Sequence, residues 1–222
     1  MSLAISPDSP DQRPTAVIIQ FAKWPQPGRV KTRLMPALGE QGALDAHIRL
    51  TLQVLENLTG SGLSVWLYWD RELAEAPSQA RDILAVADRR QIPQGVQAGK
   101  DLGERMVNAL AEGLLQADVA VIVGSDCPSV DAGYLHQAVT ALQTADVVLG
   151  PSEDGGYVLI GARKTISGML DGIDWGTDQA YQQTLAALSS RGLATRSLAT
   201  RWDVDEPKDW ERFLASSLPA GL

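Results

Sequence analysis

The 222-residue sequence has one cysteine and two histidines, and it lacks several common catalytic signatures. A single cysteine, Cys127, cannot form a disulfide within the chain. No HExxH, CxxC or GxSxG pattern occurs, so zinc hydrolases, dithiol redox proteins and serine hydrolases have no support. A P-loop would require glycine at Pro25 and Val30. A pairing of Cys127 with His47 or His136 as a nucleophile is disfavoured, because both histidines lie in apolar helical stripes.

Long apolar runs are also missing. A charge, a glycine or a proline interrupts every run before it reaches the roughly 18 residues that a membrane helix needs. The first residues lack the basic start and apolar stretch of a signal peptide. We therefore expect no membrane insertion and a cytoplasmic location, where reducing conditions suit a lone cysteine.

Positive charge is in short supply. Nineteen Lys and Arg residues stand against 27 Asp and Glu residues, which gives a net charge of -8. This balance argues against broad binding to nucleic acid or to an anionic membrane. Yet residues 20–36 hold four bases, Lys23, Arg29, Lys31 and Arg33, and no acid. A local cationic loop in an acidic protein indicates a small polyanionic ligand.

The average composition, 45% hydrophobic and 21% charged, predicts one globular α/β domain over residues 15–218, preceded by a disordered lead over residues 1–14. Apolar runs and stripes alternate along this domain. Strands are expected at 15–22, 63–69, 119–123, 146–149, 157–162 and 194–198. Helices are expected around 44–58, 102–114, 131–142 and 177–188 and from Pro207. Residues 83–97 support no more than a short strand or two. In α/β sheets, ligands collect at the carboxyl ends of the strands.

The basic loop follows the first expected strand directly. Its prolines and Gly28 permit a stiff turn, and Arg29, Lys31 and Arg33 occupy alternate positions. In an extended loop these three cations would share one side, which suits a di- or triphosphate. The alternative is a solvated loop that makes surface ion pairs.

Two further segments carry acids at places where a partner is required. Asp126 follows a compact apolar strand, where a carboxylate needs a cation, a hydrogen bond or a metal ion. The commoner alternative is that Asp126 caps the following helix. Asp203 and Asp205 alternate before Pro207, so they would point the same way and call for a cation, unless Asp205 simply opens a helix. The segment 153–157 is itself compatible with a plain hairpin turn.

Four segments, FAKWPQPGRVKTRL, VGSDCPSV, GPSEDGGYVLIG and WDVDEPKDW, occur in this order along the chain. Together they resemble an uncharacterised bacterial family of GT-A-like nucleotide-diphospho-sugar transferases. This resemblance implies an α/β, single-domain GT-A fold with a mixed, mostly parallel sheet sandwiched by helices. Molybdenum-cofactor and phospholactate nucleotidyltransferases are similar at a greater distance.

The resemblance also implies roles for residues. The nucleotide would be bound by Phe21, Ala22, Lys23, Gly28, Arg29, Lys31, Thr32, Arg33 and Ser125. Asp126 would hold Mg²⁺ or Mn²⁺, with Asp203 or Asp205 as a second carboxylate. The sugar or acceptor would meet Asp154, Gly155, Gly156, Tyr157, Trp175 and Asp178. Asp126, Asp154 and Lys31 would be catalytic. One departure is that Ser125-Asp126-Cys127 offers a single carboxylate where glycosyltransferases of this fold carry DxD, which moves the site toward the nucleotidyltransferase pattern.

These observations predict a metal-dependent glycosyltransferase that uses a nucleotide-diphospho-sugar donor and an unknown small acceptor, with Asp154 or Glu153 taking the acceptor's proton. One alternative is a nucleotidyltransferase that joins an NTP to a small phosphate and releases pyrophosphate. Another is a nucleotide-binding protein without turnover. Asp126→Ala or Asp126→Asn is expected to abolish metal-dependent nucleotide binding while the fold survives.

Overall fold

The computed structural model describes residues 14–216, so most of the predicted N-terminal lead and the last two residues of the predicted domain lie outside the described residues. Seven strands form one sheet in the order β3-β2-β1-β4-β6-β5-β7. The strands are β1 (Ala16–Ala22), β2 (Ser64–Trp69), β3 (Gln94–Val96), β4 (Val119–Gly124), β5 (Val147–Pro151), β6 (Tyr157–Ala162) and β7 (Thr195–Ser197). Only β6 runs against its neighbours, so the described sheet is mixed and mostly parallel, as predicted.

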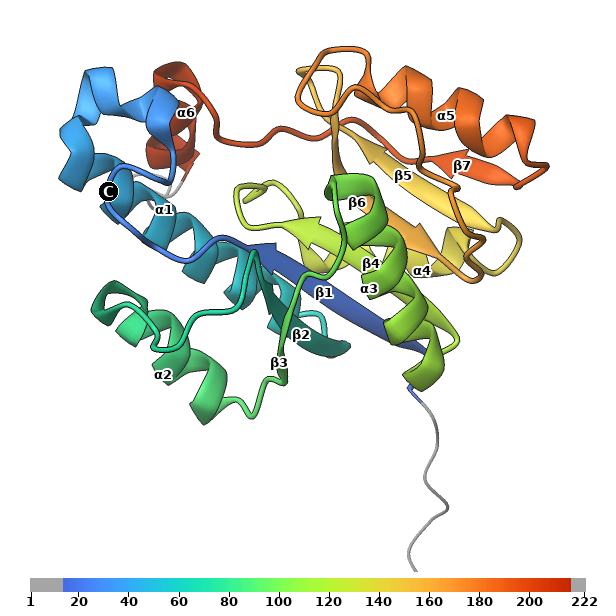
Figure 1. Cartoon of the computed structure of the whole chain (residues 1–222), viewed down its shortest axis with the longest axis horizontal. Coiled ribbons are helices and arrows are strands. Elements are labelled where there is room, and N and C mark those ends of the chain that lie inside the picture. Colours follow the sequence, from blue (N-terminus) through green and yellow to red (C-terminus); the bar gives the residue numbers. More distant parts are fainter. Residues whose placement is uncertain (1–13, 217–222) are drawn as a thin grey trace, which may run out of the picture.

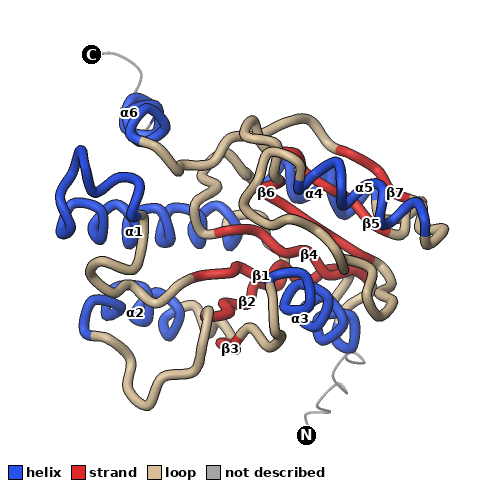
Figure 2. Tube along the Cα trace, turned by 45° about the horizontal axis from the view of Figure 1, so that its top comes forward, coloured by secondary structure: helices blue, strands red, loops and turns tan. Residues whose placement is uncertain are grey.

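Helices cover both faces of the sheet (Figures 1 and 2). Their bounds are α1 (Met35–Thr59), α2 (Arg81–Arg89), α3 (Leu102–Gln116), α4 (Ala132–Ala141), α5 (Ala180–Ser190) and α6 (Pro207–Ser216), with short 3₁₀ turns η1 (Thr32–Leu34) and η2 (Ser78–Ala80). Side chains of α1, α2 and α4 form one core cluster with one face of the sheet, and those of α3 and α5 form a second cluster with the other. Apolar strands such as β1, buried except for Phe21, explain why both faces must be covered. None of the helices in residues 14–216 combines the length and the apolar character needed to cross a membrane.

Most predicted elements are confirmed, and the differences have local causes. Residues 81–89 form helix α2, although the sequence predicted no more than short strands there. Ile83 and Ala87 are its buried residues and lie on one side of it, as in a short amphipathic helix. Helix α5 begins at Ala180 and not at Thr177, whose hydroxyl instead donates to the carbonyl of Asp174. The cap of α4 is Asp131, which accepts a hydrogen bond from the Tyr134 N–H. The helix-cap interpretation of Asp126 is therefore wrong.

The chain order brings several chemically active segments to one edge of the sheet. Strands β2 and β4 lie on opposite sides of β1, so the connections after them diverge and leave a crevice at the carboxyl ends. Strand β6 runs the other way, and its first residue, Tyr157, therefore lies at this same edge. The segment 198–206 then crosses this end of the molecule from β7 to α6, and it is the red loop near the top of Figure 1. Loops from six strands thus meet there.

Candidate functional site

Aromatic stacking and hydrogen bonds to neighbouring strands fix the shape of the basic loop after β1. The Trp24 ring is buried and stacks on Trp69 with ring centroids 3.8 Å apart. Its backbone N–H donates to Asp70 Oδ1 at 2.8 Å, and its indole N–H donates to the Arg71 carbonyl at 2.8 Å. Gly28 has a φ of +71°, which allows the chain to turn. The loop is therefore a structured element with a defined cationic face.

Lys31 joins three distant stretches of the chain. Its ammonium donates to Asp126 Oδ2 at 2.9 Å and also to the Val204 carbonyl. The Val204 N–H donates in turn to the Asp126 carbonyl at 2.9 Å. Lys31 has the left-handed conformation (φ 46°), which is uncommon for a residue other than glycine. Its side chain is only 8% exposed, whereas that of Asp126 is 40% exposed.

The charges in this pair reinforce one another. Burial alone disfavours the ammonium of Lys31, but the Asp126 carboxylate outweighs that penalty and raises the pKa of Lys31. Burial likewise opposes ionisation of Asp126, and Lys31 again prevails, lowering the pKa of Asp126 to about 2. Both groups are charged at neutral pH. Arg33 makes a second ion pair, with Asp205.

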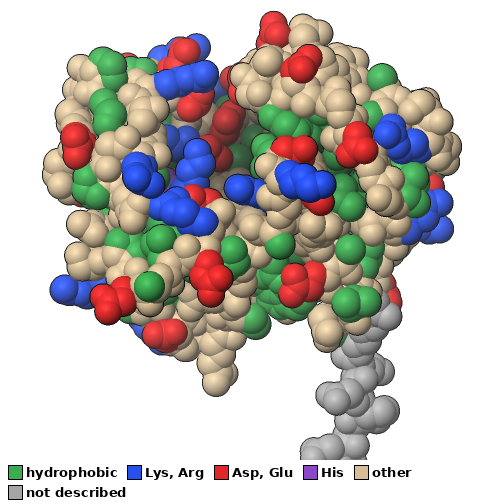
Figure 3. Space-filling view, viewed as in Figure 1, with side chains coloured by type: hydrophobic (Ala, Val, Ile, Leu, Met, Phe, Trp, Pro, Cys, Tyr) green, Lys and Arg blue, Asp and Glu red, His purple; other side chains and the backbone are tan. Residues whose placement is uncertain are grey.

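A pocket of about 520 Å³ opens over these residues, and we call it the cationic pocket. Five cations and three carboxylates line it, and Figure 3 shows Lys and Arg side chains around a hollow of this face with carboxylates inside it. The predicted residues that line it are Phe21, Ala22, Lys23, Arg29, Lys31, Thr32, Arg33, Ser125, Asp126 and Asp205. Gly28 is not among them, because it turns the loop beside the Glu40 carboxylate instead.

The sequence analysis missed several residues of this pocket: His47, Asp70, Gln97, Leu102 and Arg105. Asp70 and Gln97 directly follow β2 and β3, so the rule that ligands collect at the carboxyl ends of strands would have found Asp70 from the correctly predicted strand. His47 is buried on α1 and hydrogen-bonds the Lys23 carbonyl at 2.9 Å. Burial lowers its pKa. His47 is therefore uncharged at neutral pH, and its hydrogen bond to the Lys23 carbonyl helps to hold the basic loop.

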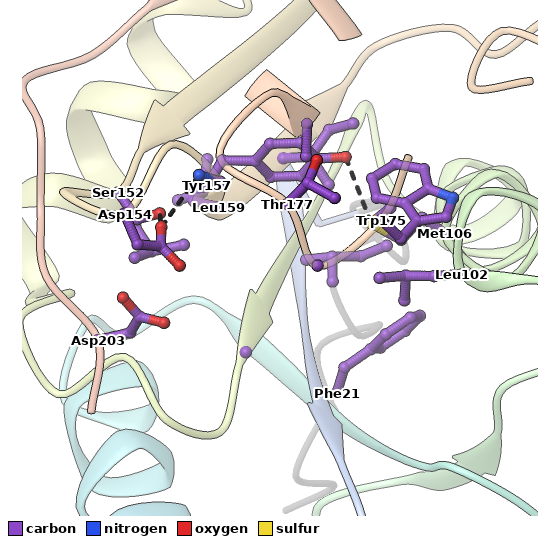
Figure 4. Close-up of a pocket in the computed structure, with 17 residues that line it drawn as sticks. Phe21, Leu102, Met106, Ser152, Asp154, Tyr157, Leu159, Trp175, Thr177 and Asp203 are labelled. Atoms are coloured by element: carbon purple, nitrogen blue, oxygen red, sulfur yellow. Dashed lines mark hydrogen bonds between the residues drawn. The ribbon is translucent and has the colours of Figure 1, made fainter. Parts of the chain in front are cut away.

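A second pocket, of about 230 Å³, lies beside the first and shares Phe21, Leu102 and Gly124 with it. We call it the apolar pocket. At one end the carboxylates of Asp154 and Asp203 face each other, and at the other end aromatic and aliphatic side chains close the space (Figure 4). The predicted residues Asp154, Gly156, Tyr157 and Trp175 line it. Gly155 and Asp178 do not.

The hairpin between β5 and β6 positions Asp154. The expected hairpin is present, since β5 and β6 pair antiparallel. Asp154 Oδ1 accepts hydrogen bonds from the Ser152 hydroxyl and, at 3.0 Å, from the Gly156 N–H. Gly155 has a φ of +88°, and a Cβ there would lie 2.2 Å from the Asp178 carbonyl oxygen. Gly155 and Asp178 therefore contribute through close backbone packing that holds the hairpin tip.

Asp203 and Asp205 do not act as one pair. Asp205 lines the cationic pocket beside Arg33, whereas Asp203 lines the apolar pocket beside Asp154. Burial, together with the charges of Asp126 and Asp154, raises the pKa of Asp203 to about 7. Glu153, the other candidate base, is engaged in a two-armed ion pair with Arg212 at 2.8 and 3.2 Å. Glu153 lines neither of the two pockets.

Among residues 14–216, no cluster of three or more His, Cys, Asp or Glu side chains has the geometry of a metal site. The donor set nevertheless fits a hard divalent cation. Asp126 and Asp203 supply carboxylate oxygens, which Mg²⁺ and Mn²⁺ prefer, usually with water and phosphate completing the shell. Burial, and then the negative charges of Asp126 and Asp154, raise the pKa of Asp203, and a bound cation would offset both effects. Asp205 is less suited, because Arg33 already neutralises it.

Residues 63–177, just over half of the chain, match a family described as "Uncharacterized protein conserved in bacteria (DUF2064)". The match includes the GSDCP and DGGY segments but ends before the DVDEP segment and begins after the basic loop. No curated protein matches the sequence.

Solved structures share the fold. A protein from Desulfovibrio desulfuricans G20, provisionally named a nucleotide-diphospho-sugar transferase, is 29% identical, with a TM-score of 0.82 over 94% of this chain and 90% of its own. A CMP:2-keto-3-deoxy-manno-octonic acid synthetase complexed with CTP is 13% identical, with a TM-score of 0.55 over 92% of this chain and 100% of its own. Rv0371c of Mycobacterium tuberculosis H37Rv, in complex with manganese, is 17% identical, with a TM-score of 0.53 over 91% and 99%. The fold is that of nucleotidyl and sugar transferases.

Proposed function

The chain belongs to the bacterial DUF2064 family, and we propose that it is a glycosyltransferase that takes a sugar from a nucleoside diphosphate and passes it to a small acceptor. One observation carries the proposal: a pocket with five cations opens directly beside a pocket whose only charges are two carboxylates. The first suits a leaving diphosphate, and the second suits a neutral nucleophile that must lose a proton. The name of the Desulfovibrio desulfuricans protein supports the same class.

The diphosphate is assigned to the exposed cations of the basic loop. Lys23 and Arg29 line the cationic pocket, and no ion pair within residues 14–216 engages either of them. They are therefore available to phosphate oxygens, with Arg29 able to bind two oxygens at once. Lys31 instead forms an ion pair with Asp126, and its role is to keep the basic loop in place.

In the transfer itself, the bond between the anomeric carbon and the diphosphate oxygen breaks, and a bond from that carbon to the acceptor oxygen forms. The acceptor's proton passes to Asp154, whose Oδ1 is oriented by Ser152 and Gly156. The electron pair of the broken bond stays on the diphosphate beside the cations. Asp126 and Asp203 would hold Mg²⁺ or Mn²⁺, which would supply further charge stabilisation to the leaving group.

A nucleotidyltransferase is the second candidate, and one feature favours it. The segment Ser125-Asp126-Cys127 has a single carboxylate, and Lys31 already engages it. The CTP complex of a fold neighbour agrees with that activity. The lack of any cation lining the apolar pocket weighs against it, because the second substrate of a nucleotidyltransferase would carry a phosphate.

The test separates the two reactions by their products. The protein is incubated with Mn²⁺ and either nucleotide sugars with acceptor alcohols or NTPs with sugar phosphates, and released nucleoside diphosphate and pyrophosphate are measured. We expect nucleoside diphosphate. Pyrophosphate release would replace the proposal with the second candidate, and saturable nucleotide binding without either product would indicate a binding protein.

A variant ties the activity to the site. The ion pair with Lys31 makes Asp126→Ala unsuitable, since it would leave a buried ammonium without its partner. We expect Asp126→Asn to lose metal-dependent nucleotide binding by at least about tenfold, since changing even a hydrogen-bond partner of a metal ligand typically costs about 10–100-fold. The matched control is Asp146→Asn, which breaks ion pairs with Arg163 and Lys164 at the opposite end of β5. Equal losses in both variants would contradict the assignment.

A further inference from the structure

The apolar end of the apolar pocket is lined by large aromatic and aliphatic side chains. Phe21, Leu102, Met106, Tyr157 and Trp175 surround it (Figure 4). The pocket as a whole, its carboxylate end included, has a volume of about 230 Å³, which exceeds that of the roughly 150 Å³ apolar protein cavity that binds benzene. A sugar would place its hydroxyl groups against side chains that offer few hydrogen bonds, at a cost in free energy. A ring-shaped apolar body fits better.

The walls of this end are already packed against one another. The rings of Tyr157 and Trp175 meet edge to face, with centroids 6.2 Å apart at 80°. The Tyr157 hydroxyl lies 3.8 Å from the Met106 sulfur. Gly103 leaves room for Trp175, whose ring would lie 3.0 Å from a Cβ at that position. The pocket is therefore formed before a ligand enters, which lowers the cost of binding.

The charge of the pocket restricts the ligand further. Among the described residues that line it, Asp154 and Asp203 are the only charged ones. Without a divalent cation at Asp203, an anionic ligand would meet two carboxylates and no basic side chain among these residues, a mismatch that disfavours phosphates and carboxylates. A hydroxyl group can instead donate a hydrogen bond to Asp154.

We propose that the acceptor is an uncharged alcohol with a ring-shaped apolar body, held between Trp175, Met106 and Phe21 with its hydroxyl at Asp154. The role of this alcohol as an acceptor rests on the proposed function, whereas the chemical class of the ligand is inferred from the pocket itself. The product is then an O-glycoside, in which the alcohol oxygen replaces the diphosphate oxygen on the anomeric carbon. The alcohol's proton remains on Asp154 until water removes it.

The test is a titration of the full chain, without nucleotide, with 2-naphthalenemethanol and cyclohexylmethanol. The probe is the indole N–H signal of Trp175 in ¹H–¹⁵N spectra, identified by its loss in Trp175→Phe. We expect saturable shifts with both alcohols. Glycerol and glycerol 3-phosphate should leave the signal unmoved, since neither has an apolar ring.

Matched variants locate the binding. Trp175→Ala should weaken 2-naphthalenemethanol at least tenfold by calorimetry. Trp66→Ala removes the same side chain from the same core cluster without touching either pocket, so it should change the affinity less than twofold. If Trp175→Ala does not fold, Leu102→Ser replaces it. Its control is Leu115→Ser, on the exposed side of the same helix.

Binding of UDP, GDP, CDP and ADP is measured in parallel to separate the two proposals. A nucleotide that binds, together with ring alcohols that leave Trp175 unmoved, overturns the inference and leaves the proposed function standing. Ring alcohols that bind but are not glycosylated in the presence of Mn²⁺ and nucleotide sugars overturn the acceptor role, and the proposed function is then decided by the release of nucleoside diphosphate with other acceptors. Tighter binding of glycerol 3-phosphate, or equal losses in the Trp66 and Trp175 variants, would refute the ligand class.

Discussion

The cationic and apolar pockets share Phe21, Leu102 and Gly124, yet they manage charge in opposite ways. In the cationic pocket, Lys31 and Arg33 each have a carboxylate partner, and the pairs connect segments far apart in the chain. In the apolar pocket, Asp154 and Asp203 repel each other, and no Lys or Arg is among the described residues that line it. Paired charges build one pocket, whereas the carboxylates of the other are left to accept a hydrogen bond or a divalent cation.

The largest effect is expected from removing the ion pair between Lys31 and Asp126. Lys31→Met leaves the Asp126 carboxylate without its cation and frees the Val204 carbonyl. We expect a loss of about 3 kcal/mol in the free energy of unfolding, at the low end for a buried pair because Asp126 is 40% exposed. Nucleotide affinity should also be lost. Urea unfolding and calorimetry measure the two effects.

The control for this variant is Lys23→Met. Lys23 is an exposed residue of the same pocket that makes no ion pair within residues 14–216. It should weaken nucleotide binding and leave stability nearly unchanged. If the two variants unfold at the same urea concentration, the pair with Asp126 does not build the pocket.

The second prediction concerns the hairpin that carries Asp154. Gly155→Ala places a methyl group against the Asp178 backbone in a left-handed conformation. We expect a loss of more than about 2 kcal/mol in stability and a displaced Asp154, because the clash with Asp178 adds to a backbone strain of about 1–3 kcal/mol. Gly172→Ala has the same sign of φ but no atom within 4 Å of the new methyl group. A thermal melt in which Gly172→Ala is equally destabilised would show that conformation, and not contact with Asp178, sets the cost.

The remaining prediction is a pH dependence that belongs to the apolar pocket. Because the pKa of Asp203 is raised to about 7, the folded protein retains a proton that the unfolded chain loses near pH 4. The stability from this proton is complete below about pH 4 and is lost as the pH rises through 7. Asp203→Asn should therefore gain at most about 4 kcal/mol relative to the parent at pH 8, since each of about three pKa units is worth about 1.4 kcal/mol, and nothing at pH 4.

Unfolding curves between pH 4 and pH 8, recorded with a chelator, check this. Asp205→Asn is the control, because Asp205 lines the cationic pocket and not the apolar pocket, and it should not remove the difference between pH 4 and pH 8 that Asp203→Asn removes. Parallel profiles for the parent and Asp203→Asn would mean that neither burial nor the charges of Asp126 and Asp154 raise the pKa of Asp203.

Much of the fold could be predicted because single segments carry their own signals. The strand at 119–123 is an uninterrupted apolar run, and Asp101 is visible as the cap of α3, where it accepts from the Glu104 N–H. Helix α2 could not be predicted with the same ease, because only Ile83 and Ala87 of its residues are buried. A short helix with so small a stripe gives a weak pattern.

The candidate site divides in the same way. The resemblance implied that the basic loop and Asp126 share one site, and the structure brings them together through Lys31. Trp24, which anchors the loop on Trp69 and Asp70, carried no signal because its partners lie in another strand. Asp203 and Asp205 looked alike in the sequence, and only the path of the crossing segment sends them to different pockets.

The sequence alone determined the class of fold, the edge of the sheet where the candidate site lies and the identity of the charged residues gathered there. These properties depend on local periodicity and on the order of strands and helices. The tertiary structure decided which charges are paired and which are left facing each other, and it formed the apolar pocket behind Asp154. Those outcomes depend on distances between residues far apart in the chain, such as Lys31 and Val204, which are 173 positions apart and which no local pattern connects.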